Sequence, residues 1–217
     1  MVIQGVAITT GTKANPSTSL TPVVGTVVIT GRDTTTVTEQ QSFTDQDLMD
    51  RVLQHCHISD CRLVRCNLRG CTLRDVILED CDGLSECDLS DGKLKRCGYI
   101  TGSRLHDASV ESAGCISLCT ITDSKIMGPS GRLDKCHMTD VRLQDGVHVM
   151  NSTVSDAEIS AGSVVVACQL TDIKLRSSTI VQCTVKDVCA KGSTLRDCTL
   201  TDARLSADCA LVGSSVN

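Results

Sequence analysis

Cysteine recurs at every fifth position in one stretch of the chain, at Cys56, Cys61, Cys66 and Cys71. An α-helix returns a side chain to the same face every 3.6 residues and a β-strand every 2, so neither puts one residue type in the same environment at a strict interval of five. The spacing therefore predicts a larger coil, whose backbone turns with a period of five residues.

The five-residue unit can be followed from residue 56 almost to the end of the chain. Each unit holds a small residue, a polar residue, a branched aliphatic residue and two polar residues, as in Cys198-Thr199-Leu200. The frame slips by one residue near Gly83 and Gly98 and loosens between residues 119 and 130. Roughly thirty such units predict a solenoid, in which each unit contacts only its neighbours.

This pattern resembles the pentapeptide-repeat family, whose consensus has a small residue two positions before a central Leu or Phe. The resemblance implies an all-β fold, a right-handed quadrilateral parallel β-helix with four units per coil. Roughly thirty units would make about 7–8 coils, and a strand spacing of ~4.8 Å would make the rod about 35 to 40 Å long.

We expect the small residue and the aliphatic residue of each unit to point inward. The small position then lies where the coil turns a corner, and the soft cysteine side chain fits beside the stacked leucines. The cysteines predicted to point inward are Cys56, Cys61, Cys66, Cys71, Cys81, Cys87, Cys119, Cys136, Cys168, Cys183, Cys198 and Cys209. Cys97, Cys115 and Cys189 are predicted to point outward, where oxidation or intermolecular crosslinks are easier. The inward thiols should stay reduced, because in-register strands aim neighbouring Cβ atoms in the same direction and apolar surroundings raise the pKa of a thiol.

Residues 1–44 do not fit the frame. Val23 to Gly31 and Thr34 to Thr38 are typical of two strands with a turn between them, which predicts a β-hairpin. A short helix over residues 45–55 is expected next, because Leu48 and Met49 with Val52 and Leu53 make an apolar stripe at helical spacing. We expect this helix to cap the first coil of a β-helix spanning residues 56–217.

Composition narrows the class of protein. There is no Trp, and Tyr99 and Phe43 are the only other aromatic residues, so the interior must be built from aliphatic and small side chains. The net charge of −5 is mild and the charges alternate along the chain, which argues against a nucleic-acid partner. Neither a signal peptide nor an apolar run of membrane-spanning length is evident, so we expect a soluble, cytoplasmic protein without membrane contact.

The strongest metal-like cluster is His55-Cys56-His57 with Cys61. We interpret these residues as structural, because consecutive strand residues point to opposite faces and the tight C-x2-C spacing of zinc sites is absent. His106, His137 and His148 are expected on the surface, and the aspartates at the ends of units (Asp60, Asp75, Asp123, Asp140, Asp172, Asp187, Asp197 and Asp202) are expected at corners, with carboxylates that accept turn N–H groups. No phosphate-binding loop, nucleophile elbow or dinucleotide motif stands in a supporting context. We therefore expect no catalytic residue, metal or cofactor, and no enzyme.

Three functions follow, in order of preference. The first is a non-catalytic scaffold or self-assembling protein-interaction module, a homo-oligomer joined end to end through the C-terminal coil or through the N-terminal hairpin. The second, implied by the family resemblance, is a DNA mimic that inhibits or protects a topoisomerase such as DNA gyrase. The third is action on carbohydrate, by analogy with larger β-helices.

Overall fold

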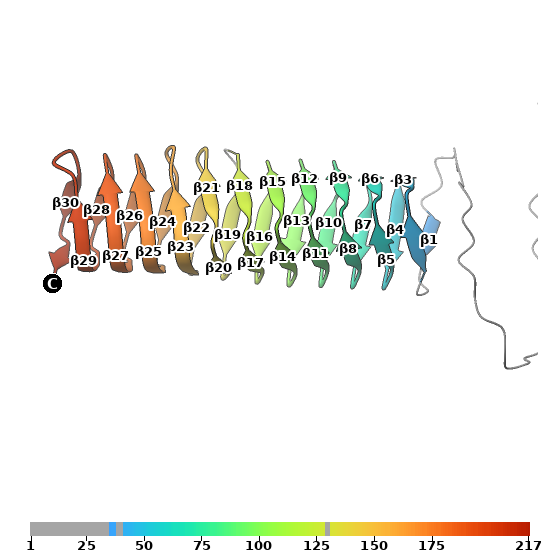
Figure 1. Ribbon diagram of the computed structural model, residues 1–217, viewed down its shortest axis with the longest axis horizontal. Helices are drawn as coiled ribbons and strands as arrows, with labels where there is room; N and C mark the ends of the chain where they lie inside the picture. Colours follow the sequence, from blue (N-terminus) through green and yellow to red (C-terminus); the bar gives the residue numbers. More distant parts are fainter. Residues whose placement is uncertain (1–34, 38–40, 129–130) are drawn as a thin grey trace, which may run out of the picture.

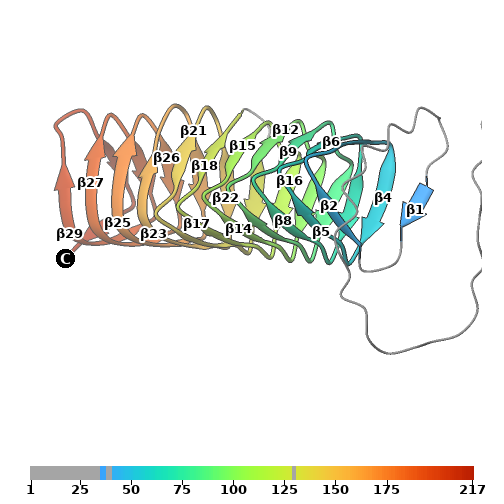
Figure 2. The same ribbon diagram turned by 45° about the vertical axis from the view of Figure 1, so that its right-hand side comes forward.

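The computed structural model describes residues 35–37, 41–128 and 131–217. They form a straight rod of short strands that coil around one axis, with the turns stacked side by side along its length (Figures 1 and 2). Successive turns pair in parallel, and the described part of the chain contains no helix. The predicted all-β parallel solenoid is confirmed.

The rod has three walls, which we name A, B and C. Wall A is a 12-stranded sheet. Its strands are β1 (Thr35–Val37), β4 (Arg51–Gln54), β7 (Asn67–Arg69), β10 (Gly83–Ser85), β13 (Tyr99–Thr101), β16 (Cys115–Ser117), β19 (Arg132–Asp134), β22 (His148–Met150), β24 (Val164–Val166), β26 (Thr179–Val181), β28 (Thr194–Arg196) and β30 (Ala210–Val212).

Walls B and C share the second sheet. Wall B holds β2 (Ser42–Thr44), β5 (His57–Ser59), β8 (Thr72–Arg74), β11 (Asp88–Ser90), β14 (Arg104–His106), β17 (Thr120–Thr122), β20 (His137–Thr139) and β31 (Ser215–Val216). Wall C holds β3 (Asp47–Met49), β6 (Arg62–Val64), β9 (Ile77–Glu79), β12 (Lys93–Lys95), β15 (Ser109–Glu111), β18 (Lys125–Met127) and β21 (Arg142–Gln144). Four longer strands begin in wall B and continue around the corner into wall C: β23 (Thr153–Ile159), β25 (Gln169–Arg176), β27 (Thr184–Lys191) and β29 (Thr199–Leu205).

One turn contains three units rather than four. Leu53 pairs with Leu68 after 15 residues, and in later turns the same wall position recurs after 15, 16 or 17. The predicted quadrilateral shape is therefore wrong, and so is the predicted number of coils. The 12 strands of wall A are separated by eleven turns, which at ~4.8 Å per turn make a rod about 50 Å long. The repeat of five sets the length of one wall, whereas the number of walls depends on the angle at each corner.

The corners are made by residues with positive φ. The non-glycine residues of this kind have φ between 48° and 61°, and most of them are aspartates. Aspartate, asparagine and glycine enter this left-handed region at lower cost than other residues, which explains why so many units end in Asp. All eight aspartates that the sequence places at corners lie there, with φ between 49° and 54°.

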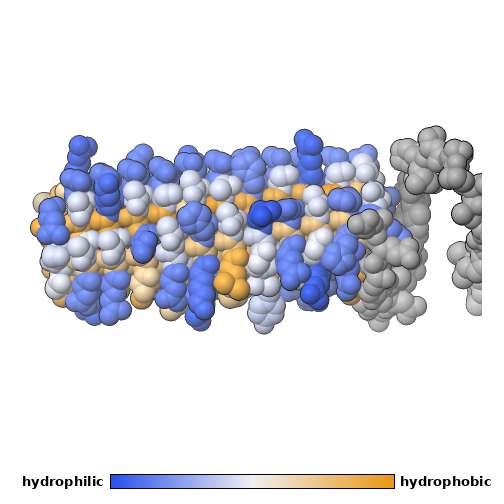
Figure 3. All heavy atoms as spheres, turned by 90° about the horizontal axis from the view of Figure 1, so that it is seen from below, coloured by the Kyte–Doolittle hydropathy of each residue, from blue (hydrophilic) through white to orange (hydrophobic). Residues whose placement is uncertain are grey.

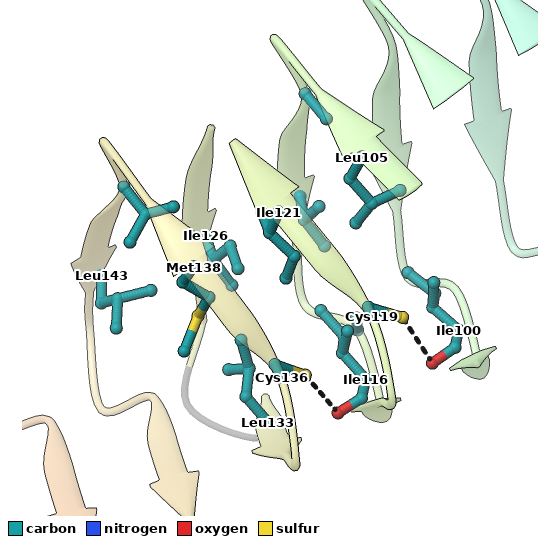
Figure 4. Packing of buried hydrophobic residues seen from close by; sticks show 14 of the residues in the cluster. Ile100, Leu105, Ile116, Cys119, Ile121, Ile126, Leu133, Cys136, Met138 and Leu143 are labelled. Carbon is teal, nitrogen blue, oxygen red and sulfur yellow. Dashed lines mark hydrogen bonds between the residues drawn. The ribbon is translucent and has the colours of Figure 1, made fainter. Parts of the chain in front are cut away.

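The interior is a set of stacked aliphatic side chains, one from each wall in each turn. In wall B, Leu105 lies over Ile121 and Ile121 over Met138, and Figure 4 shows this column. All three side chains are at most 1% exposed. The ring of Phe43, partly buried in the first turn, is the aromatic group that packs against this interior, since Tyr99 is 70% exposed. The narrow lumen is filled by side chains of nearly uniform size.

The helix predicted over residues 45–55 is wrong, because this segment forms strands β3 and β4. Phe43, Leu48 and Leu53 occupy the inward positions at the same spacing of five, so the solenoid begins earlier than the predicted boundary at residue 56. The large polar residues Gln46 and Arg51 stand where later units have small residues, and this hides the frame in the sequence.

The predicted hairpin falls mostly outside the described residues. Its second strand is present as β1, which pairs in parallel with β4 as part of wall A. The proposed first strand, Val23 to Gly31, lies outside the described residues. Among the described residues, we find no helical segment with the length and apolarity to cross a bilayer.

The one-residue slips of the frame occur at a single corner, where the chain enters wall A. Gly98 and Gly114 are stacked there, and Gly114 N–H donates to the carbonyl of Gly98 at 3.1 Å. A Cβ added at Gly98 would lie 2.4 Å from the carbonyl oxygen of Asp82 in the preceding turn. This backbone contact leaves no room for a side chain.

We expect Gly98→Ala to destabilise the rod by about 1 to 3 kcal/mol, because the new methyl group must push backbone rather than a flexible side chain. Gly83→Ala is the matched control, since its added Cβ would meet only an ordinary contact at 3.6 Å. Urea unfolding followed by circular dichroism measures both. Equal stability of the two variants would contradict the stacking at this corner.

Candidate functional site

The metal-like cluster of the sequence does not converge in space. Cys56 points into the core and is 1% exposed, while His55 lies at a corner and His57 lies on the outer side of wall B. Cys61 belongs to the next corner along the chain. In the described ranges, no three His, Cys, Asp or Glu side chains are placed to hold a metal ion.

The cysteines are distributed largely as the repeat predicts. Eleven of those predicted to point inward are at most 3% exposed: Cys56, Cys61, Cys66, Cys71, Cys81, Cys87, Cys119, Cys136, Cys168, Cys183 and Cys198. Cys189 is exposed and Cys115 is half-buried on the outer side of wall A. All fifteen cysteines are free thiols.

Two cysteine predictions need correction. Cys97 is buried, at 2% exposure, because the extra residue of its unit, Gly98, follows the small position and does not precede it. Cys209 is half-buried although it occupies a small position, because it belongs to the last turn, which has no further turn packed on it within the described chain.

One corner of the rod carries a nearly continuous column of thiols and hydroxyls, where the chain enters wall B. Its members are Cys56, Cys71, Cys87, Ser103, Cys119, Cys136, Ser152, Cys168, Cys183, Cys198 and Ser214. The thiols of Cys119 and Cys136 donate to the carbonyls of Ile100 and Ile116 in the preceding turn, at 3.6 and 3.5 Å (Figure 4). Sulfur also accepts from backbone, since Cys168 N–H donates to Cys183 Sγ at 3.3 Å. The column therefore satisfies buried polar groups at the corner.

Burial raises the pKa of several thiols of the core. Desolvation raises the pKa of Cys66 to about 11 and that of Cys136 to about 12, against an ordinary value of 9.0. These thiols stay protonated at neutral pH, and only the thiolate is a good nucleophile. Cys66 and Cys136 are therefore suited to packing rather than to chemistry.

A second corner, between walls B and C, carries one aspartate in every turn. We name this set the acidic column: Asp45, Asp60, Asp75, Asp91, Asp107, Asp123, Asp140, Asp156, Asp172, Asp187 and Asp202. The register of wall B stacks these residues, since the residues just before them, such as Thr122, Thr139 and Ser155, pair turn by turn. All eleven are exposed to solvent.

The carboxylates of the column do not make the predicted hydrogen bonds to turn N–H groups. Asp140, Asp156, Asp172 and Asp202 have neither an ion pair nor a hydrogen-bonded side chain in the part of the chain that the structure describes. Aspartate is used at this corner for its backbone conformation, and its charge is left facing water.

A long groove follows the acidic column from Asp107 to the last turn, with a volume of about 1430 Å³. Its floor is made of small and aliphatic residues such as Ala108, Val141 and Val188. Rows of hydrophilic side chains separated by apolar stripes run along the rod in Figure 3. The acidic column forms one side of this groove.

The opposite side of the groove carries mostly positive charge. We name these residues, at the first strand position of wall C, the basic row: Ser109, Lys125, Arg142, Glu158, Lys174, Cys189 and Arg204. Arg142, Lys174 and Arg204 are exposed and make no ion pair with another described residue. The groove therefore has sides of opposite sign, and at the turns of Asp140, Asp172 and Asp202 neither side makes an ion pair within the described residues.

Several surface charges outside the groove are paired. Asp50 accepts two hydrogen bonds from Arg65 at 2.7 and 2.8 Å, and Asp80 accepts two from Arg96 at 2.6 and 2.9 Å, at the corner between walls C and A. The guanidinium of Arg96 lowers the pKa of Asp80. His106 lies 3.1 Å from Asp107 and 3.5 Å from Asp123, whereas His137 and His148 are exposed on walls B and A.

The groove can attract and align charge, and nothing in it favours bond-breaking. Its carboxylates are exposed, whereas a carboxyl group that acts as a general acid is usually set apart by burial. Neither aromatic residue of the chain lines it. Of the eight aspartates that the sequence predicts at corners, seven belong to the acidic column and Asp197 lies at another corner. The sequence analysis did not predict the basic row, because its members are separated by 15 to 17 residues along the chain.

Comparison with known families and structures gives the following matches. Residues 52–82 match the family model described as pentapeptide repeats (8 copies). A search of curated proteins finds no match.

Three solved structures represent the structural matches. The A-module of mannuronan C-5 epimerase AlgE4 from Azotobacter vinelandii is 8% identical, covers 82% of each chain and has a TM-score of 0.38. HetL, a pentapeptide repeat protein involved in heterocyst differentiation regulation from Nostoc sp. strain PCC 7120, is 16% identical, with 85% of this chain and 89% of HetL covered and a TM-score of 0.26. The catalytic domain of a GH87 alpha-1,3-glucanase is 6% identical, with 86% and 61% covered and a TM-score of 0.36. Scores this low carry no argument about function.

We expect the free energy of unfolding to fall as the pH rises from 9 to 11. The unfolded thiol titrates near 9.0 and folded Cys66 at about 11, so the native chain keeps a proton that the unfolded chain has lost. The contribution of this thiol to the free energy of unfolding is complete below pH 9 and is lost as the pH rises through 11. For one such thiol the loss is on the order of 2 kcal/mol. Urea titrations at several pH values measure it.

Cys66→Ala should flatten this pH dependence, and Cys189→Ala, which removes an exposed thiol, should leave it unchanged. Identical slopes in both variants would show that the buried thiols do not cause the loss.

Proposed function

The chain is a pentapeptide-repeat protein, and on that premise we propose that it is a non-catalytic rigid rod, a structural scaffold that assembles with other copies and presents its walls to protein partners. The observation that carries the proposal is the unbroken register of eleven turns, in which each strand of wall A pairs with the next. A rod of this kind holds groups on its surface at fixed distances from one another.

The uniform interior supports this function. Every turn is closed by the same stacked aliphatic residues and small corner residues, and no buried described side-chain N or O atom lacks a hydrogen-bond partner. Catalytic sites usually need a concave pocket with a few buried polar groups, and the elongated groove is open and lined by exposed charges.

The last turn supplies a surface for self-association. Leu211 and Val216 stand at inward positions, as Leu195 and Leu200 do one turn earlier, yet they are 42% and 51% exposed while the earlier pair is buried. Strands β30 and β31 have no further described strand beside them. Open strand edges next to apolar side chains favour pairing with another chain, and we propose end-to-end contact between two copies.

We expect the 217-residue protein to self-associate in a concentration-dependent manner, and we expect Leu211→Asp to reduce that association at least about tenfold, because a charge would be buried in the contact. Light scattering coupled to size-exclusion chromatography measures the mass. Tyr99→Asp is the control, since Tyr99 is 70% exposed in the middle of wall A. A strict monomer at high concentration would contradict the end contact.

DNA mimicry is a second candidate, favoured by the acidic column. Eleven carboxylates in line along a rod resemble the regular negative charge of a duplex, although the basic row lies beside them. If the protein is a scaffold, we expect micromolar concentrations of it to leave DNA supercoiling by gyrase uninhibited. Inhibition that disappears in an Asp140→Asn, Asp156→Asn, Asp172→Asn triple variant would favour mimicry instead.

A further inference from the structure

At the turns of residues 140 and 172, the two sides of the groove carry opposite charges that make no ion pair within the described molecule. On the acidic side Asp140, Asp156 and Asp172 are exposed and unpaired, and on the basic side Arg142 and Lys174 are exposed and unpaired. Elsewhere on the rod, several basic residues form ion pairs with acidic residues of a neighbouring turn, as Arg65 does with Asp50. The groove is therefore a surface whose complement lies outside the molecule.

The axial repeat restricts what that complement can be. The acidic side presents one carboxylate per turn, and successive turns lie about 4.8 Å apart. An extended peptide presents side chains on one face only every ~6.6 to 6.8 Å, so its charges fall out of step within a few residues. A second β-solenoid has the same repeat as this one and stays in step over the whole groove.

The arrangement of charge matches a second copy of this chain. If two rods lie side by side and parallel, related by a two-fold axis along their length, the acidic column of each faces the basic row of the other. The two-fold operation preserves height along the rod, so Asp140 comes opposite Arg142 of the second copy and Asp172 comes opposite Lys174. Glu158 reverses the charge of the basic row at one turn, and Ser109 and Cys189 are neutral at two others.

We propose that this groove is a lateral interface through which two copies of the chain pair side by side in parallel. The proposal goes beyond the end-to-end scaffold and does not depend on it, since the end contact uses Leu211 and Val216 and the lateral contact uses walls B and C. Because the contact is confined to one corner and its charges are exposed, the pairing is weak and sensitive to salt.

A charge swap tests the pairing. The first variant, Arg142→Glu with Lys174→Glu, has two negative sides, and the second, Asp140→Lys with Asp172→Lys, replaces two carboxylates by ammonium groups. Lysine is tolerated at such corners, because Lys135 has a φ of 55° in the native chain. All proteins carry Leu211→Asp, so that end contacts do not contribute, and circular dichroism checks that each one folds.

Sedimentation velocity at about 20 mM and about 500 mM salt measures association. The parent, which carries Leu211→Asp alone, should dimerise at low salt and dissociate at high salt. Each charge-swap variant alone should associate at least about tenfold more weakly than the parent. An equimolar mixture of the two variants should recover the dimer, because at the turns of residues 140 and 172 negative groups then face positive groups again.

Three outcomes would overturn the proposal. A parent that stays monomeric at low salt excludes the interface. Variants that associate as well as the parent place the contact elsewhere. Loss of association in both variants without recovery in the mixture would show that the groove serves a different cation or anion and does not pair with itself. Val181→Asp, on the outer side of wall A, is the control for added charge.

Discussion

The structure depends on one constraint: at nearly every corner, one residue adopts the left-handed backbone conformation with positive φ. Each one turns the chain after a strand of about three residues, and three such turns bring the backbone back over itself after 15 to 17 residues. All later features follow from this geometry, because the closed turn stacks equivalent positions into columns. A strand this short has no stability alone, and the ladders between turns supply it.

The interior shows how a core can be built with almost no aromatic residues. Each turn adds three aliphatic side chains and three small ones to a narrow lumen, and cysteine or serine at one corner also satisfies backbone groups of the preceding turn. Cysteine is suited to this position because it is small, apolar and a weak hydrogen-bonding partner in both directions. The many thiols are thus explained by packing, and the raised pKa values of Cys66 and Cys136 follow from the same burial.

Function in such a molecule must come from the surface columns, since the interior is the same in every turn. At the turns of Asp140 and Asp172, the acidic column and the basic row differ from the paired charges at the opposite corner in making no ion pair within the described rod. The exposed apolar residues of the last turn differ from their buried equivalents in the same way. Both differences indicate surfaces that other chains can cover, which is the property expected of a scaffold.

The sequence by itself determined the wall: a five-residue period, the inward position of Cys61 or Leu63, and aspartate at a corner such as Asp140, all of which follow from local backbone geometry. Only the tertiary structure decided that three walls close a turn, because the corner angle leaves no trace in the period. That closure sets which distant residues meet, so Asp140, Asp156 and Asp172 form one column. Arg142 and Lys174 lie in line along the rod, two turns apart. The burial of Cys97 and the strands at residues 47–54 were also decided there, since packing against neighbouring turns overrode the local signals of a slipped frame and a helical stripe.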